Sequence, residues 1–161
     1  MNRKERIEQK MQELFHSHAA GNEGTDPEFM QILQGYIFGD VCYTGSLDNR
    51  MRELITITTL TVLSTLPQLK AHVQAGLNAG CTPVEIRETI YQCAPFIGFP
   101  KTLNAISTMN EVFAENQIQL PLEKQGTLVD DGERFKKGVA IQKPVYGDEI
   151  QDRYTWLPGD F

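Results

Sequence analysis

The sequence has few cysteines, and their spacing excludes the usual thiol sites. The chain of 161 residues has three, Cys42, Cys81 and Cys93, and no two of them form a C-x-x-C pair. An odd number of widely spaced cysteines is not typical of a disulfide framework or a structural zinc site. His16 and His18 are two residues apart, which places them on different faces of a helix. We therefore expect reduced thiols, a cytoplasmic protein and no bound metal.

Excess positive charge and long apolar runs are also lacking. Lys and Arg number 15 against 21 Asp and Glu, giving a net charge of −6, whereas a nucleic-acid binder would present a basic surface. No apolar segment reaches the length of a membrane-spanning helix. Residues 1–14 are charged where a signal peptide would be apolar, so export is not expected. Neither nucleic acid nor a membrane is an expected partner.

The remaining sequence has helical periodicity, and its length is sufficient for one domain with a buried core. Turn signals separate the expected helices, which cover residues 3–18, 27–38, 48–65, 65–80, 82 to a break at Pro95 and the GFP of 98–100, 100–116 and 132–142. The predicted class is therefore all-α with six or seven helices. Residues 1–118 are expected to form the helical domain, and residues 119–161 a linker, a short helix and a C-terminal arm.

Glu53 is expected to be buried although it is charged. A helical projection of residues 48–65 gives two apolar faces. One contains Met51, Leu54, Ile55, Thr58 and Val62. Glu53 shares the other face with Ile57 and Leu60. A buried carboxylate must be paired, or burial raises its pKa, and either outcome makes Glu53 a candidate acid or base.

His72 lies at the border between the apolar and polar faces of the next helix. Its neighbours on that helix are the small residues Ala75, Gly76 and Ala79, which leave space for closely packed helices or for a ligand. A border histidine is often structural, bonded to a carbonyl or here to Glu53. Paired titratable groups in an apolar setting also form acid/base sites. Both interpretations stay open.

Four motifs follow one another in the central region without large gaps. They are R-E-L at 52–54, L-x-x-H at 69–72, G-x-T-x-x-E-I-x-E at 80–88 and G-F-P-x-x-x-N-A at 98–105. With these motifs, residues 36–113 resemble the carboxymuconolactone decarboxylase family, which shares the all-helical fold of the alkylhydroperoxidase-D-like proteins. The resemblance implies that fold, no cofactor, and assembly as a homo-oligomer, either a trimer or a hexamer.

The redox branch of this fold carries the pattern E-x11-C-x2-C-x3-H. That register falls here on Glu53, Thr65, Gln68 and His72. Thiol peroxidase chemistry needs an attacking and a resolving thiol, and both are replaced at this position. Thr65 and Gln68 instead fit a T-x-x-Q capping box. A peroxiredoxin-like antioxidant that uses Cys81 or Cys93 stays an alternative.

The decarboxylase branch lacks the C-x-x-C pair, and the resemblance to it implies loss of CO2 from 4-carboxymuconolactone, a small carboxylated lactone. The product, 3-oxoadipate enol-lactone, must be protonated on carbon, which requires a proton donor and cations that hold carboxylates. The hypothesis assigns His72 as the donor and Glu53 as its partner. Substrate contacts are expected from Arg50, Arg52, Thr65, Gln68 and Tyr43.

Several of these assignments have a structural alternative. Arg50 fits an exposed charge near a helix start, and Arg52 an ion pair with Asp48 four residues earlier. The aromatic residues Tyr36, Tyr43 and Phe99 either line a pocket or pack in the core. A third interpretation of the whole chain is a non-catalytic oligomer that binds a ligand.

The C-terminal residues contain a second resemblance. The segment GERFKKGVAIQKPVYGDEI is similar to the arm that often precedes the core in this family, but here it follows the core. Such an arm is expected to dock on a neighbouring subunit through Tyr154, Trp156 and Leu157. The alternative is a poorly ordered C-terminus.

Overall fold

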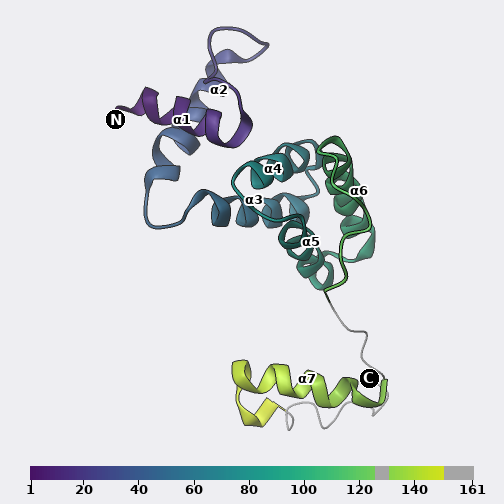
Figure 1. Ribbon diagram of the computed structural model, residues 1–161. Coiled ribbons are helices and arrows are strands. Elements are labelled where there is room, and N and C mark those ends of the chain that lie inside the picture. The colour runs from purple at the N-terminus through teal and green to yellow at the C-terminus, as the bar shows by residue number, and fades with distance from the viewer. Residues whose placement is uncertain (126–130, 151–161) are drawn as a thin grey trace. The chain divides into compact units, whose positions relative to one another are not determined.

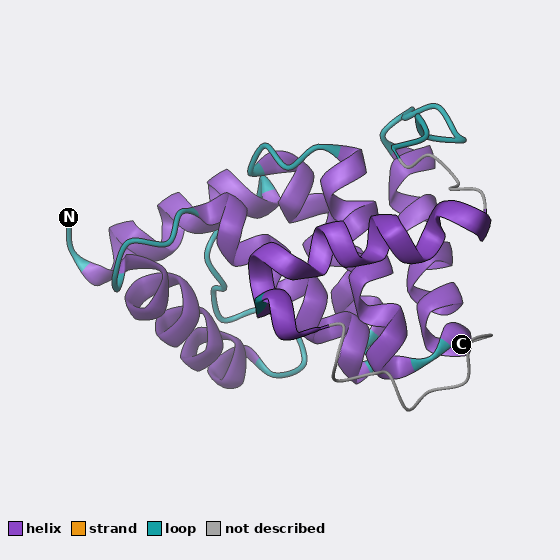
Figure 2. Cartoon of the chain, turned by 90° about the horizontal axis from the view of Figure 1, so that it is seen from below, coloured by secondary structure: helices purple, strands orange, loops and turns teal. Residues whose placement is uncertain are grey.

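All regular structure that the computed structural model describes, in residues 1–125 and 131–150, is helical, as Figure 2 shows. The α-helices are α1 (Arg3–Phe15), α2 (Pro27–Gln34), α3 (Asn49–Leu63), α4 (Leu66–Asn78), α5 (Pro83–Ile97), α6 (Phe99–Glu115) and α7 (Asp131–Tyr146). A π-helical segment, η1 (Gly35–Asp40), and two short 3-10 segments, η2 (Val41–Tyr43) and η3 (Asp148–Ile150), complete the list. The predicted all-α class is confirmed. Within the described ranges, no helix has both the length and the apolar character needed to cross a membrane.

The chain divides into two compact units, residues 1–122 and residues 123–161. The first unit ends at residue 122, and Leu122 packs against its core. The described part of the second unit contains α7 and η3. The expected apolar anchors of the C-terminal arm, Tyr154, Trp156 and Leu157, lie outside the described residues.

Helices α3, α4, α5 and α6 form the main bundle (Figure 1). Helix α3 contacts both α4 and α5, and α6 contacts the same two helices. The side chains inside this bundle that have no exposed surface are Ile57, Leu69, Val73, Ile86, Ile90, Ala105 and Phe113. Burial of each large apolar side chain contributes about 1.5–3 kcal/mol. The packed bundle therefore fixes the positions of α3 and α4 and of the side chains that these two helices direct toward each other.

Helix α1 packs on the outside of α4 and against η1. A second apolar cluster forms there from Met11, Leu14, Phe38 and Ala75. On the neighbouring position of α4, a Cβ atom at Gly76 would lie 3.3 Å from Cδ1 of Ile57. The small residues beside His72 therefore allow close helix packing, which is one of the two roles predicted for them; the other was to leave space for a ligand.

The helix boundaries confirm some sequence signals and contradict others. Thr82 and Glu85 form the predicted capping box of α5. The box predicted for α4 is wrong: the Thr65 side chain makes no cap hydrogen bond, and its hydroxyl donates to the Leu60 carbonyl at 3.4 Å. Gln68 is exposed. Only Ser64 and Thr65 connect α3 to α4, so this turn directs Thr65 back toward the preceding helix.

Two predicted helix ends also differ from the structure. Pro95 does not break α5, which continues to Ile97, whereas the break predicted at the GFP of 98–100 is confirmed, since Gly98 follows the last helical residue with φ of 78°. The first helix ends at Phe15 and not near residue 18, since His16 adopts a left-handed backbone conformation with φ of 49°. His18 therefore lies outside the helix, where Nδ1 contacts Glu8.

Candidate active site

Glu53 and His72 meet between α3 and α4. Nδ1 of His72 lies 2.7 Å from Oε2 of Glu53. Glu53 is 3% exposed, as the helical projection predicted. An ionised Glu53 can only accept, so it pairs with the tautomer of His72 that carries its proton on Nδ1, and this leaves Nε2 for a different partner. The pair has the arrangement of a buried acceptor that orients a histidine.

The imidazole of His72 is held from a second side by α1. The rings of Phe15 and His72 are 5.6 Å apart between centroids and stand edge to face at 85°. Phe15 also contacts Phe38 of η1 with a centroid distance of 5.6 Å. These aromatic contacts fix the plane of the ring, while 22% of the His72 side chain stays exposed. The histidine is thus oriented and still accessible.

A cavity of about 200 Å³ opens beside this pair. The residues that line it are Ile37, Phe38, Val41, Cys42, Leu47, Arg52, Glu53, Ile55, Thr56 and His72. Most are apolar, and the charged side chains among them are Arg52 and Glu53. An apolar cavity with one cation and one carboxylate–histidine pair fits a small acid.

Arg52 lines the cavity and also supports the loop before α3. Its Nε donates to the carbonyl of Leu47 at 3.0 Å, and its Nη2 donates to the carbonyl of Thr44 at 2.7 Å. The alternative pairing with Asp48 is wrong. The Asp48 side chain caps α3 instead, accepting from the backbone N–H of Met51 at 2.8 Å, so its carboxylate is held at the helix start.

The other predicted substrate contacts lie away from the cavity. Arg50 forms an ion pair with Glu85 of α5. The Tyr43 hydroxyl donates toward the Arg6 carbonyl and Oε1 of Gln9, at 3.3 and 3.2 Å, so α1 holds this ring. Thr65, Gln68, Tyr36 and Phe99 do not line the cavity either. Sequence spacing alone does not determine which face of a turn or helix meets a neighbour, and a role of these residues in substrate binding stays a prediction.

Sequence reasoning missed Cys42 as a member of the site. This residue belongs to η2 and lines the cavity with His72. Burial is the main cause that raises the pKa of the Cys42 thiol, and the nearby charge of Arg52 partly opposes it. Cys81 and Cys93, the thiols considered for antioxidant chemistry, are buried elsewhere in the bundle. No motif marks Cys42, since a π-helical segment brings it to the site.

The site can therefore bind an anion and move a proton. Arg52 supplies positive charge, and the oriented histidine has one nitrogen that does not face Glu53. Residues 1–125 and 131–150 include no group of three or more His, Cys, Asp or Glu side chains arranged to hold a metal ion. The chemistry that these side chains offer is acid–base chemistry on a small anion.

Comparison with known proteins finds similar sequences among decarboxylases. A family model described as the carboxymuconolactone decarboxylase family matches residues 27–111, more than half of the chain. The 4-carboxymuconolactone decarboxylase of Acinetobacter baylyi is 30% identical over 88 residues, which cover 55% of this chain and 66% of that protein. Nitrosuccinic acid decarboxylase of Metarhizium robertsii is 24% identical over 95 residues, or 56% of this chain and 66% of that protein.

A third relative has no activity in its name. An uncharacterized 15.0 kDa protein of Paracoccus denitrificans is 40% identical over 80 residues, which cover 48% of this chain and 60% of that protein. The chain thus spans slightly less than two thirds of the length of each of these three relatives. The range matched by the family model contains Cys42, Arg52, Glu53 and His72.

Proposed function

The chain belongs to the carboxymuconolactone decarboxylase family, and from this membership we propose that it is a cofactor-free decarboxylase of a small carboxylated lactone or a related acid. One observation carries the proposal: the hydrogen-bonded pair of Glu53 and His72 shares a cavity with Arg52. The names of two relatives, a 4-carboxymuconolactone decarboxylase and a nitrosuccinic acid decarboxylase, support the same reaction class.

Binding relies on Arg52 and on the size of the cavity. The guanidinium holds a carboxylate that stays on the product, because arginine matches the planar geometry of carboxylates. The Leu47 and Thr44 carbonyls that accept from Arg52 fix its position. A cavity of about 200 Å³ is below the usual range for drug-sized ligands, so a compact acid is the expected substrate.

The reaction then needs one proton. The bond between the substrate carbon and its carboxyl group breaks, CO2 leaves, and the electron pair moves into the adjacent electron-withdrawing group of the substrate. The imidazole of His72 delivers a proton from Nε2 to the carbon. Glu53 accepts from Nδ1 throughout and balances the positive charge that the ring carries before transfer.

A thiol reaction is the second candidate, because Cys42 lines the same cavity. Its raised pKa keeps the thiol protonated near neutral pH, and the thiolate is the reactive form. No other cysteine lines this cavity, so a resolving thiol is missing from the described site. A thiol reaction is therefore less well supported by this site than decarboxylation.

The experiment is an assay of the full chain with 4-carboxymuconolactone and with nitrosuccinate as probes, following CO2 release and deuterium uptake on carbon in D2O. We expect turnover of one probe, a loss of at least about 100-fold in His72→Gln, and retained turnover in Cys42→Ser. Full turnover in His72→Gln overturns the assigned mechanism. Absence of CO2 from both probes and from other compact diacids overturns the function.

We also propose that the protein self-associates through the outer face of α3, defined by Met51, Ile55 and Val62. These side chains are 43%, 49% and 41% exposed, although helical periodicity marks them as a buried stripe. Ile55 also lines the cavity, so a second copy would lie beside its opening. Sedimentation analysis should give an oligomer that Met51→Lys with Val62→Lys dissociates; a monomeric wild type would contradict this.

A further inference from the structure

A cavity of about 380 Å³ lies where α1, α2 and the segment that connects them meet. The residues that line it are Lys4, Ile7, Ala19, Ala20, Gly21, Gln31 and Gln34. None of them lines the cavity beside His72. Most of them precede residue 27, where the region matched by the family model begins. This cavity is therefore a separate site, built largely by a part of the chain that lies outside the matched family region.

Gln34 of α2 brings a hydrogen-bond donor without a partner to this cavity. The residue is 6% exposed, and its Oε1 accepts from the backbone N–H of Ala20 at 2.6 Å. A backbone N–H can only donate, so Oε1 is the atom that faces Ala20 and Nε2 is the atom that faces away. Within residues 1–125 and 131–150, Nε2 has no hydrogen-bond partner, and it still reaches open space. Deeply buried side chains usually satisfy their polar atoms, so Nε2 needs an acceptor inside the cavity.

Hydrogen bonds from both helices hold the connecting segment that forms one wall of the cavity. In addition to the bond at Ala20, Glu8 of α1 accepts from the backbone N–H of Ala19 at 3.0 Å. Nε2 of Gln31 on α2 donates to the carbonyl of Gly21 at 2.7 Å. Three consecutive residues of the connection are thus bonded to α1 or α2. The cavity is therefore preformed, which reduces the entropy that a ligand loses on binding.

Lys4 of α1 adds a positive charge to the lining. Among the described residues that line the cavity, none is acidic, and Lys4 forms no ion pair within the described ranges. Glu8 follows one turn later on α1, but its two oxygens contact other groups, the N–H of Ala19 and Nδ1 of His18. Both lower the pKa of Glu8 more than Lys4 does. With Ile7 as an apolar neighbour, an ammonium and an amide N–H favour a ligand with a carboxylate and a short apolar body.

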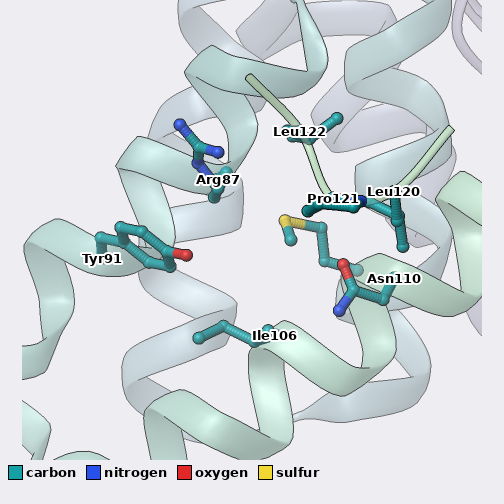
Figure 3. Close-up of a pocket in the computed structure, with 8 residues that line it drawn as sticks. Arg87, Tyr91, Ile106, Asn110, Leu120, Pro121 and Leu122 are labelled. Carbon is teal, nitrogen blue, oxygen red and sulfur yellow. The ribbon is translucent and has the colours of Figure 1, made fainter. Parts of the chain in front are cut away.

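A larger cavity between α5 and α6 differs in this respect (Figure 3). Arg87 is the charged residue among the described residues of its lining. Its guanidinium donates to Glu88 at 3.2 Å and lies 5.6 Å from the centre of the Tyr91 ring. The cation of that cavity therefore already has partners within the protein, whereas the amide donor of Gln34 has none among the described residues.

We propose that the cavity between α1 and α2 binds a small aliphatic monocarboxylate. One carboxylate oxygen accepts from Nε2 of Gln34, the ammonium of Lys4 lies beside the carboxylate, and the aliphatic body packs against Ile7 and the two alanines of the lining. Binding here is independent of decarboxylation at His72, because no described residue lines both cavities.

The test uses NMR on the full chain, labelled with 15N at its glutamine side-chain amides and with 13C at its alanine methyl groups, and butyrate as the probe. The amide resonance of Gln34 should shift in a saturable manner as butyrate is added, while that of Gln68, exposed on α4, should stay in place. Gln34→Glu identifies the resonance, because it removes it. This variant keeps an acceptor for the N–H of Ala20 but lacks the donor. The butyrate Kd read from the alanine methyl groups should therefore weaken by at least about tenfold.

A matched pair of lysine substitutions tests the charge. Lys4→Gln should weaken the butyrate Kd by about two- to fivefold, since the side chain is exposed and the contact is screened by water. Lys101→Gln removes the same charge from an exposed position on α6 and should leave the Kd unchanged.

A neutral analogue separates carboxylate recognition from general apolar binding. Butyramide has nearly the same shape as butyrate and should bind at least about fivefold more weakly. The proposal is overturned if the Gln34 amide does not respond to butyrate, if Gln34→Glu binds butyrate as the wild type does, if both lysine substitutions have the same effect, or if butyramide binds equally well. If Gln34→Glu does not fold, the Gln34 resonance is assigned through its contact with the N–H of Ala20, and the wild-type response and the butyramide comparison decide.

Discussion

His72 Nδ1 and Glu53 Oε2 are 2.7 Å apart, and this contact joins a carboxylate with almost no exposed surface to an imidazole that reaches the cavity. The two residues are 19 positions apart in the sequence. The short connection between α3 and α4 places them side by side, and the surrounding bundle keeps water from the carboxylate. A buried acceptor of this kind has few alternatives to its histidine partner, so the pair should act as one unit.

Glu53→Gln should lower kcat by about 10- to 100-fold in the proposed decarboxylation, because the amide can still accept from Nδ1 but carries no charge. Glu53→Ala should lower kcat further, since it removes the hydrogen-bond acceptor of Nδ1 as well as the charge. Steady-state kinetics on the full chain measures both effects.

The double variant provides the control for this coupling. Glu53→Gln combined with His72→Gln should be no slower than His72→Gln alone, because residues that act as a unit have non-additive effects. Multiplicative losses in the double variant would contradict the pairing.

Arg52 and Arg50 give a matched pair of substitutions two residues apart on α3. Arg52→Gln should raise KM by about tenfold or more, because it removes a charged contact to the substrate carboxylate. Arg50→Gln removes an ion pair with Glu85 whose side chains are 39% and 37% exposed, so the free energy of unfolding should change by at most about 1 kcal/mol. KM should not change in that variant. Equal effects of both substitutions on KM would contradict the assignment of Arg52 as a substrate contact.

The helical projection predicted the part of the site that lies on regular helices. It placed Glu53 on a buried face because a period of 3.6 residues fixes which side chains share a direction. It could not find Cys42, which reaches the cavity through the π-helical segment before it. Periodicity also cannot tell which apolar face is covered: Ile57 is fully buried, whereas Ile55 of the same helix is 49% exposed.

Side-chain hydrogen bonds at helix ends were predicted with mixed success. Thr82 and Glu85 form a capping box because Thr82 has the extended backbone that this box requires. Thr65 has a different backbone, with ψ of 74°, in a connection of two residues. The same capping-box pattern therefore forms at Thr82 and not at Thr65. The length of the connection before the helix constrains the backbone of the cap residue, and the pattern does not include that length.

Alkylation should mark Cys42 as the thiol of the site. Burial raises the pKa of this thiol, so its reaction with iodoacetamide should be slow at pH 7 and should accelerate as pH rises beyond the usual thiol range of about 8.5. An acid bound beside Arg52 should protect it. Peptide mapping by mass spectrometry measures the rate, and faster labelling of the buried Cys81 or Cys93 would contradict the assignment.

Glu13 should make the attachment of α1 to α3 sensitive to acid. Burial opposes ionisation of this carboxylate, but hydrogen bonds from Lys10, Asn49 and Gln9 together lower its pKa. A lowered pKa stabilises the fold above the unfolded value of about 4.3, and this stabilisation is lost as pH falls through the folded value. Urea unfolding should therefore show a larger deficit for Glu13→Gln at pH 7 than at pH 3. A deficit that does not depend on pH would contradict this.

Close packing at Gly76 should make its substitution depend on Ile57. Alanine in a helix interior gains up to about 1 kcal/mol over glycine, but the new Cβ would lie 3.3 Å from Cδ1 of Ile57 and 3.5 Å from Cδ1 of Ile86. Both isoleucines are fully buried, so neither can move freely, and overpacking costs about 1–3 kcal/mol. Gly76→Ala alone should therefore be destabilising.

Ile57→Val removes the methyl group that blocks the new Cβ, at a cost of about 0.5–1.5 kcal/mol. The double variant with Gly76→Ala should be more stable than the sum of the two single effects by about 1 kcal/mol, because the alanine then keeps its helical gain with less of the clash. Urea midpoints with an unchanged m value measure this coupling. Strict additivity would mean that α3 and α4 are loosely packed at Gly76. In that case, the close approach of the two helices that brings Glu53 to His72 would not require a glycine at position 76.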